Sequence, residues 1–356
     1  MDKFNSSANA SRRGFLKLSA LAIPFVKGAG VGKEVMKDMQ VIKPASLQHG
    51  DTVGLVSPAG VTYESVQIDI IEETLDMLGL KMKAGQYMMD RWGYFAGTDE
   101  HRAADINNMF ADEHVDAIFA LHGGWGAARA LPFLDYEVIR ANPKIFMGYS
   151  DITALLIAIY ANTGLITFHG PNGNSVWNEF SANYVKKLLF DADSVLYKNP
   201  EEKGDALVVV NDRIRTISSG KARGKLVGGN LTVLTSIIGS DQLPNWEGHI
   251  LFLEDIGEAI YRIDRMLTQL KLSGVLDQIA GFVFGNCNDC TANSGYNSFT
   301  LNEILDHHIK PLGIPAWTGS MIGHIENKFT IPIGVEAEIN ADLGQIKLLE
   351  PAVFKP

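Results

Sequence analysis

Residues 144–161 read KIFMGYSDITALLIAIYA, an apolar run followed by a short polar turn and a second, longer apolar run. The first run, 144–147, has the length of a buried strand, and the second, 152–161, has the length of a helix. Ser150 stands at the turn between them. A serine on a tight strand-to-helix turn is held away from its own backbone and lies beside the free N–H groups of a helix N-terminus. The sequence therefore predicts a strand followed by a helix and makes Ser150 a candidate nucleophile.

The turn alone does not establish a nucleophile, because serines also cap many helices and Gly148-Tyr149-Ser150-Asp151 lacks the second glycine of the Gly-x-Ser-x-Gly elbow. An activated serine needs a base and a group that orients the base. The apolar run 249–253 predicts a strand that leads into Glu254, at the strand end where open α/β sheets place their sites. The polar segment 323–334 carries His324, which we expect to be the base.

Strand-like and helix-like segments alternate through the first half of the chain. Strands are predicted at 52–57, 115–121 and 144–147, and helices at 66–80 and 101–110. This alternation predicts a parallel sheet with helices on both faces. We expect a first domain over 43–197, a linker with polar turn composition over 198–220, and a smaller second domain over 221–356 that mixes strands and helices.

The segments around Ser150, Glu254 and His324 resemble three sequence blocks of the LD-carboxypeptidase family. These blocks are Gly148-Tyr149-Ser150-Asp151, Leu253-Glu254-Asp255 with Tyr261-Arg262-Ile263-Asp264-Arg265, and Gly323-His324 with Pro332-Ile333-Gly334. Further matching blocks are Gly50-Asp51-Thr52-Val53 with Ser57-Pro58, Ala96-Gly97-Thr98-Asp99 with Arg102 and Asp105, Gly123-Gly124-Trp125-Gly126, Phe168-His169-Gly170-Pro171, and Gly228-Gly229-Asn230-Leu231. The resemblance runs in one order from about Lys43 to the C-terminus. The family comprises serine peptidases that remove the terminal D-alanine from murein tetrapeptides, and it includes the microcin C immunity hydrolases.

The resemblance implies a fold and a set of site residues. The fold is α/β, with an N-terminal parallel sheet of flavodoxin or glutamine-amidotransferase type and a strand-rich C-terminal domain. Ser150 is the nucleophile, His324 the general base and later acid, and Glu254 the carboxylate that orients the imidazole. The oxyanion hole comes from the backbone amides of Asp151 and Gly124. Substrate contacts are expected from Gly123 and Trp125.

Two neighbouring residues offer alternatives, and one departs from the family pattern. Glu258 lies one helical turn beyond Glu254 and is the rival acid, although its place favours a role on the helix surface. His169 is expected to be a structural histidine that lines the cleft with its hydrogen bonds satisfied. His122 stands before the glycine pair where we expect an arginine or similar residue in the family.

The resemblance also implies a reaction: hydrolysis of the bond between the third residue of a murein stem peptide and its terminal D-alanine, through an acyl-enzyme and without a cofactor. One alternative is hydrolysis of a peptidyl-nucleotide, as in the microcin C immunity proteins. Another is a non-catalytic protein that binds muropeptides. Family members commonly pair, so a homodimer is expected.

The N-terminal segment predicts export. Ser11-Arg12-Arg13-Gly14-Phe15-Leu16-Lys17, followed by an apolar run over 18–26, is typical of a twin-arginine signal, which we place at residues 1–32. The apolar run is shorter than the roughly 20 residues that a membrane-spanning helix needs. We therefore expect no permanent membrane anchor and an enzyme in the periplasm or otherwise outside the cytoplasm.

The composition of the chain narrows its class. With 356 residues, of which 46% are hydrophobic, the chain is long enough for two domains and a sizeable core. Its net charge of −10 argues against nucleic acid as a partner. The two cysteines form a lone Cys287-x-x-Cys290 pair without the second ligand pair of a zinc site, so we expect no metal, and either a local disulfide or packed thiols.

Overall fold

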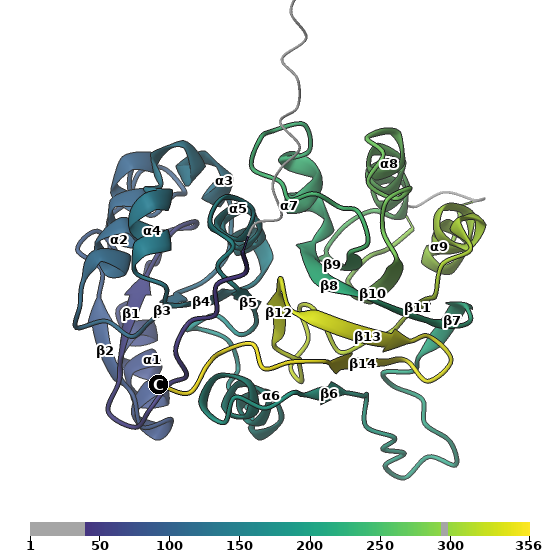
Figure 1. The fold of residues 1–356 in the computed structure, drawn as a ribbon, viewed down its shortest axis with the longest axis horizontal. Coiled ribbons are helices and arrows are strands. Elements are labelled where there is room, and N and C mark those ends of the chain that lie inside the picture. The colour runs from purple at the N-terminus through teal and green to yellow at the C-terminus, as the bar shows by residue number, and fades with distance from the viewer. Residues whose placement is uncertain (1–39, 293–297) are drawn as a thin grey trace, which may run out of the picture. The chain divides into compact units, whose positions relative to one another are not determined.

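Two sheets form the framework of the protein in the computed structural model, which describes residues 40–292 and 298–356 (Figure 1). The predicted export signal at 1–32 lies outside the described residues. Within the described part, no helix is both long enough and apolar enough to cross a membrane.

The first sheet has six strands, and all neighbours are parallel except the pair β12 and β5. In spatial order the strands are β12 (Ile331–Ile333), β5 (Thr167–His169), β4 (Ile145–Gly148), β3 (Ala117–Ala120), β1 (Thr52–Val56) and β2 (Lys81–Ala84). Its main helices are α1 (Val66–Met77), α2 (Asp99–Ala111), α4 (Tyr136–Ala141) and α5 (Thr153–Thr163). Strands β3 and β4 are buried at every position, as their continuous apolar runs predict for the centre of a parallel sheet.

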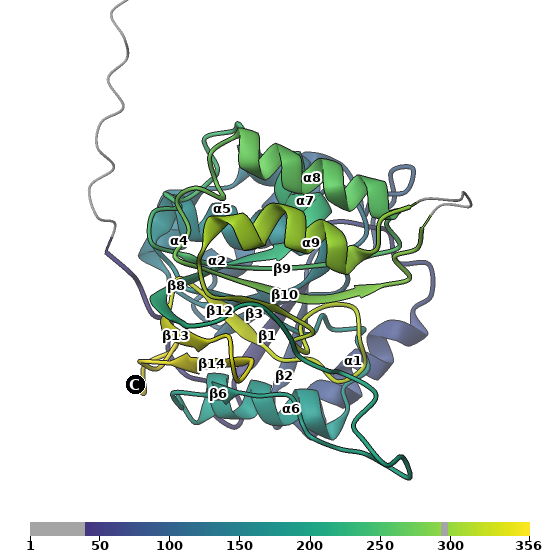
Figure 2. The ribbon, with the colours of Figure 1, turned by 90° about the vertical axis from the view of Figure 1, so that its right-hand side faces the viewer.

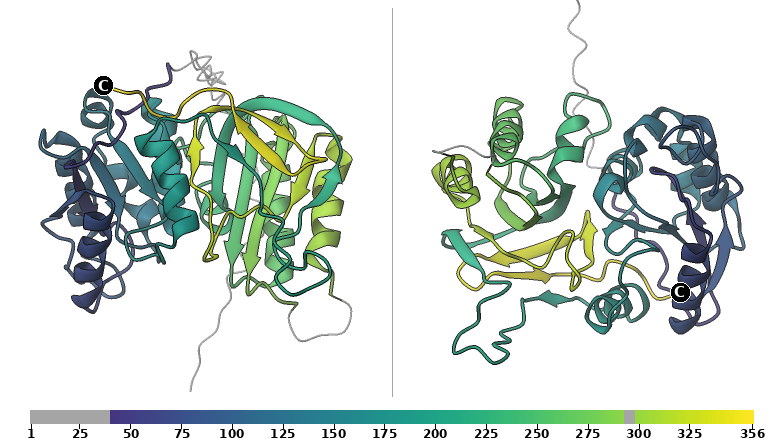
Figure 3. Two further views of the ribbon diagram at one scale, coloured as in Figure 1. Left: turned by 90° about the horizontal axis from the view of Figure 1, so that it is seen from below. Right: turned by 180° about the vertical axis from the view of Figure 1, so that it is seen from behind.

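The second sheet has eight strands: a parallel centre of β8, β9, β10 and β11, and antiparallel strands on either side. In spatial order they are β6 (Leu196–Tyr197), β14 (Gln345–Leu348), β13 (Glu336–Asn340), β8 (Lys221–Asn230), β9 (Ile250–Ile256), β10 (Gly281–Asn288), β11 (Ala316–Thr318) and β7 (Arg215–Ser218). Figures 1 and 2 show α7 (Leu231–Ser236), α8 (Ile260–Leu272) and α9 (Leu301–Ile309) on one face of this sheet. Figure 3 shows the green parallel strands side by side.

Helix α5 joins the two sheets into one core. It is apolar around its circumference, as is typical of a helix buried on all sides, and it packs against β4, β8 and β12. At its first residue, the Thr153 hydroxyl accepts a hydrogen bond from the Asn230 backbone N–H at 3.0 Å. At its end, Gly164 has φ of 79°, the left-handed conformation that ends many helices. The start of α5, which follows Ser150, is thereby fixed against the second sheet.

The α/β class and the central elements agree with the sequence predictions. The predicted strands overlap β1, β3 and β4, and the predicted helices overlap α1 and α2. The residues of the two sheets do not follow the predicted domain boundaries. β12, from the C-terminal part, pairs with β5 of the first sheet, whereas β6, before residue 198, lies in the second. The 198–220 segment contains β7, and its part before residue 215 has no helix or strand.

Candidate active site

Ser150 lies at the turn between β4 and α5, in a backbone conformation that L-residues rarely adopt. Its φ is 65°, the left-handed region, and it is partly exposed. The turn is crowded, since a Cβ at Gly148 would lie 2.8 Å from the Asn172 side-chain oxygen and 2.9 Å from Ile152. Strained backbone of this kind is concentrated at functional sites, where surrounding packing maintains it. The structure therefore presents Ser150 as the sequence predicted, on a tight strand-to-helix turn.

The glycine turn after β3 lies directly against Ser150. A Cβ at Gly123 would stand 2.9 Å from the Ser150 Cβ, 3.0 Å from its Oγ and 3.4 Å from the Asp151 backbone nitrogen. The backbone at Gly124 has a φ of 120°, a conformation that strongly favours glycine because any side chain would be strained there. Within the described chain, the Gly124 N–H has no hydrogen-bond acceptor, and Asp151 lies in the first helical turn, whose N–H groups have no acceptor in the helix. The N–H groups of Gly124 and Asp151 are thus backbone donors without an acceptor among the described residues.

His324 and Glu254 form a hydrogen-bonded pair. The His324 Nδ1 is 2.7 Å from Oε2 of Glu254, whose side chain is fully buried in β9, two residues before the strand ends. The His324 side chain is 13% exposed and so keeps limited access to solvent. The Asn288 side chain donates to the His324 carbonyl oxygen at 2.5 Å. The described structure thus fixes both the ring and the backbone of His324.

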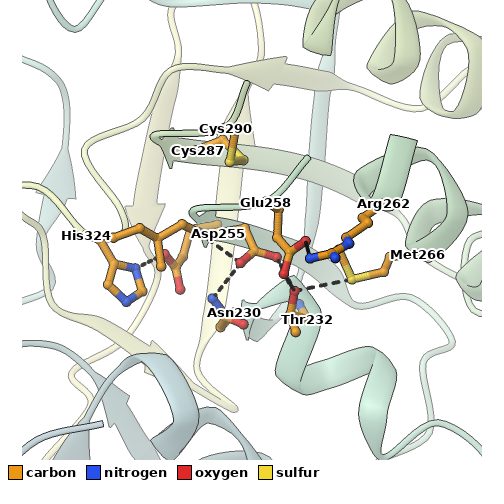
Figure 4. Close-up of a disulfide and its surroundings, with 11 residues drawn as sticks. Asn230, Thr232, Asp255, Glu258, Arg262, Met266, Cys287, Cys290 and His324 are labelled. Carbon is orange, nitrogen blue, oxygen red and sulfur yellow. Dashed lines mark hydrogen bonds and ion pairs between the residues drawn. A yellow bond between two sulfur atoms is a disulfide. The ribbon is translucent and has the colours of Figure 1, made fainter. Parts of the chain in front are cut away.

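The side chain of the alternative acid, Glu258, does not bond to His324 in the described structure. It accepts hydrogen bonds from Arg262 and Thr232, both at 3.4 Å, as Figure 4 shows. In the same figure the imidazole of His324 points away from this group. The carboxylate that contacts His324 is therefore Glu254.

Tyr149 brings the serine and histidine loops side by side. The centroid of its ring lies 4.8 Å from that of His324, and the Lys328 ammonium lies 5.1 Å from the Tyr149 centroid. Lys328 is 5% exposed, and burial lowers its pKa. Sequence reasoning assigned no role to Tyr149 or Lys328, because a tyrosine at a turn and a lysine in a polar loop are ordinary there.

His169 differs in one respect from its prediction. It is buried, as expected of a structural histidine, and burial lowers its pKa to about 4. However, neither ring nitrogen has a hydrogen-bond partner in the described part of the chain, so its hydrogen bonds are not satisfied as predicted. Oε1 of Glu254 is buried and unpaired in the same way. The lowered pKa favours the neutral form of the His169 ring.

Asp151 contributes a side chain as well as the predicted amide. Its Oδ2 accepts a hydrogen bond from the Ala127 N–H at 2.7 Å, just after the glycine turn. Arg102, fully buried, donates to the Gly126 carbonyl oxygen at 2.7 Å. Burial raises the pKa of Asp151 to about 6. The first bond connects the serine turn to the residue after the glycine turn, and the second connects the glycine turn to α2.

Trp125 projects from the glycine turn and is 68% exposed. With Tyr94, Phe95, Gly126 and Arg129 it lines a hollow of about 610 Å³. Asp99 fixes Arg129 through three hydrogen bonds of 2.8 to 3.1 Å. Predominantly aromatic hollows with a few polar groups are typical of binding sites for organic ligands.

The two cysteines of the chain are bonded to each other. Cys287 and Cys290 form a disulfide, which resolves the alternative left by the sequence. Across residues 40–292 and 298–356, no three His, Cys, Asp or Glu side chains are grouped to hold a metal ion.

Comparisons with known proteins identify the family. The LD-carboxypeptidase N-terminal domain matches residues 53–170, and its C-terminal domain matches residues 223–339. The chain belongs to the LD-carboxypeptidase family. It is therefore a peptidase, as the sequence resemblance indicated.

Several relatives are similar over nearly their whole length. A probable murein peptide carboxypeptidase of Bacillus subtilis is 40% identical, over 84% of this chain and 91% of the relative. The microcin C7 self-immunity protein MccF of Escherichia coli is 33% identical, over 86% and 95%. The structure of MccF with glutamyl sulfamoyl guanosine has a TM-score of 0.79 at 30% identity, covering 88% of this chain and 99% of that one. For muramoyltetrapeptide carboxypeptidase from Oxalobacter formigenes the TM-score is 0.71 at 28% identity, with 83% and 97% covered.

Proposed function

We propose that this peptidase is a serine-type LD-carboxypeptidase that releases the terminal D-alanine from murein tetrapeptides. The observation that carries the proposal is the bond between Glu254 and His324 beside the strained turn of Ser150. A nucleophile, a base and a carboxylate that orients the base are the parts that acyl transfer by serine requires.

The first half of the reaction forms the acyl-enzyme. A carboxylate accepts from Nδ1–H of His324, so the lone pair is left on Nε2. Nε2 takes the hydroxyl proton of Ser150 as Oγ attacks the carbonyl carbon of the third stem residue. The carbon–nitrogen bond then breaks, and the imidazolium returns the proton to the departing D-alanine amine. Buried Glu254 stabilises the imidazolium between these two transfers.

The second half repeats these transfers with water. Nε2 of His324 removes a proton from water, the resulting nucleophile attacks the ester carbon, and Ser150 leaves with the proton. In both halves the carbonyl oxygen becomes negative. The Gly124 and Asp151 N–H groups are the donors we assign to that oxyanion, each of which is worth roughly a hundredfold or more in rate.

The aromatic hollow favours a second candidate, hydrolysis of a peptidyl-nucleotide amide. Nucleobases stack on aromatic rings with about 1–3 kcal/mol per base, and Trp125 and Tyr94 are exposed beside the glycine turn. The similarity to MccF points the same way. The murein reaction remains the first choice because the 40% identical relative is a probable murein peptide carboxypeptidase.

Mass spectrometry of reaction products separates the candidates. Purified protein and a Ser150→Ala control are incubated with lysine-type and diaminopimelate-type tetrapeptides and, separately, with a peptidyl-nucleotide. We expect D-alanine release by the unmodified protein alone. Cleavage of the peptidyl-nucleotide alone would replace the first candidate by the second. Turnover of none of these substrates, combined with measurable muropeptide binding, would indicate a non-catalytic binding protein.

We also propose that the protein is exported by the twin-arginine route and acts as a homodimer. The sequence of residues 1–32 supports export. Cell fractionation tests the proposal: changing Arg12 and Arg13 to Lys should retain the protein in the cytoplasm. Light scattering of the purified protein tests the dimer, and a monomer mass would contradict it.

A further inference from the structure

His122 precedes the glycine turn and bonds to it on one side. Its Nδ1 is 2.7 Å from the carbonyl oxygen of Gly123, and its Nε2 is 3.1 Å from the hydroxyl of Thr62. A carbonyl oxygen only accepts, so Nδ1 carries the proton. The hydroxyl of Thr62, which is 5% exposed, then donates to Nε2. The imidazole therefore has one defined tautomer, fixed from both ends.

The bond to Gly123 determines the direction of the next N–H group. The C=O of Gly123 and the N–H of Gly124 belong to one trans peptide, in which they point in opposite directions. Gly123 O is held by Nδ1 of His122 and, more loosely, by the Gly60 N–H at 3.2 Å. Because these donors hold the carbonyl oxygen on one side, the Gly124 N–H faces the other.

This peptide needs an external restraint. It lies between two glycines, which have the widest conformational freedom, so its plane can rotate more easily than any other peptide of the turn. Stabilisation of an oxyanion depends on donors that are already oriented before the reaction begins. The sequence led us to expect an arginine or similar residue at position 122, and the histidine found there bonds directly to the glycine turn.

We propose that His122 is a positioning residue that holds the Gly123–Gly124 peptide so that the Gly124 N–H faces the developing oxyanion. The inference rests on the proposed function, because it assumes an acyl transfer at Ser150. The imidazole touches no reacting atom, and its action passes through the peptide alone.

Two substitutions at residue 122 test the geometry. The amide nitrogen of asparagine lies where Nδ1 of histidine lies, so His122→Asn keeps a donor for the Gly123 carbonyl. In His122→Gln the amide lies one bond further out, near Nε2, and this donor is lost. Glutamine is nearer to histidine in size, so a role in packing alone predicts the opposite order of activities.

The measurements are kcat and KM for D-alanine release, together with affinity for a tripeptide boronate, which forms a tetrahedral anion on the serine. We expect His122→Gln to lower kcat by roughly 30- to 100-fold with KM within about twofold, and His122→Asn to stay within about fivefold of the unmodified protein. Affinity for the boronate should fall in the same proportion as kcat, whereas affinity for the tripeptide product should not change.

Equal kcat in the two variants, a greater loss in His122→Asn, or a rise in KM alone would overturn the inference. If His122→Gln does not fold, Thr62→Val provides a second test. It should lower kcat by about threefold or more at constant KM, and an unchanged kcat would contradict the inference. Turnover by the unmodified protein reports separately on the proposed function.

Discussion

Replacing Glu254 with glutamine removes a charge and almost no volume from the centre of the proposed site. Oε2 of Glu254 lies 2.7 Å from Nδ1 of His324, and its side chain has no exposed surface. Two effects follow from the change. The imidazolium loses its counter-charge, and the new amide can place its NH₂ group against Nδ1, which moves the histidine proton to Nε2 and removes the base.

The structure indicates that this loss of activity is large. Oε1 of Glu254 has no partner among the described residues, so nothing else prevents the amide from turning either way. Replacing the carboxylate of a serine triad by an amide costs about 10⁴ in kcat, or roughly 5 kcal/mol in activation free energy.

Glu258→Gln is the matched control. It is the same substitution four residues away, at a carboxylate that bonds to Arg262 and Thr232 and not to His324. Steady-state release of D-alanine and urea unfolding are measured for both variants. We expect about 10⁴-fold loss of kcat for Glu254→Gln and less than threefold loss for Glu258→Gln, because Glu258 does not bond to His324. A Glu254→Gln variant within tenfold of the unmodified enzyme would refute the reasoning.

Three further changes test other parts of the structure. Burial raises the pKa of Asp151 to about 6, so its contribution to stability is present below pH 4 and lost as pH rises through 6. This loss lowers the free energy of unfolding by up to about 3 kcal/mol, and Asp151→Asn should remove it. A free energy of unfolding that depends on pH in the same way in the variant, measured with urea, would contradict this. Gly123→Ala places a Cβ 2.9 Å from that of Ser150 and should lower kcat at least about 100-fold, with a circular dichroism spectrum like that of the unmodified protein. A kcat within threefold of the unmodified protein would show that the backbone of the turn can move to accommodate the methyl group. Exchanging Cys287 and Cys290 for serine opens a very short loop and should lower the free energy of unfolding by about 2 kcal/mol, and no change would mean that the disulfide does not form in the purified protein.

Much of the framework was predictable because it depends on local pattern. The apolar run before Ser150 became β4, and the apolar run after it became α5, since length and periodicity determine such elements. The pairing of Glu254 with His324 could be inferred only through the family resemblance. The two residues are 70 positions apart, and no periodicity relates them.

Contacts that depend on how turns pack were not predictable. The bond from Ala127 to the Asp151 carboxylate and the bond from His122 to Gly123 arise from turns whose side chains could equally face solvent. β12 returns to the first sheet as an edge strand, which suits the proline in its middle. Its three residues are too few for a pattern to show which sheet they join.

The most direct test of the central claim is to identify the residue that reacts as the nucleophile. The protein is treated with a serine-reactive fluorophosphonate, with and without excess tetrapeptide, and the adduct is located by peptide mass spectrometry. We expect a single adduct on Ser150, slowed by the tetrapeptide and absent in Ser150→Ala. An adduct on another residue, or D-alanine release that persists in Ser150→Ala, would contradict the assignment of Ser150 as the nucleophile.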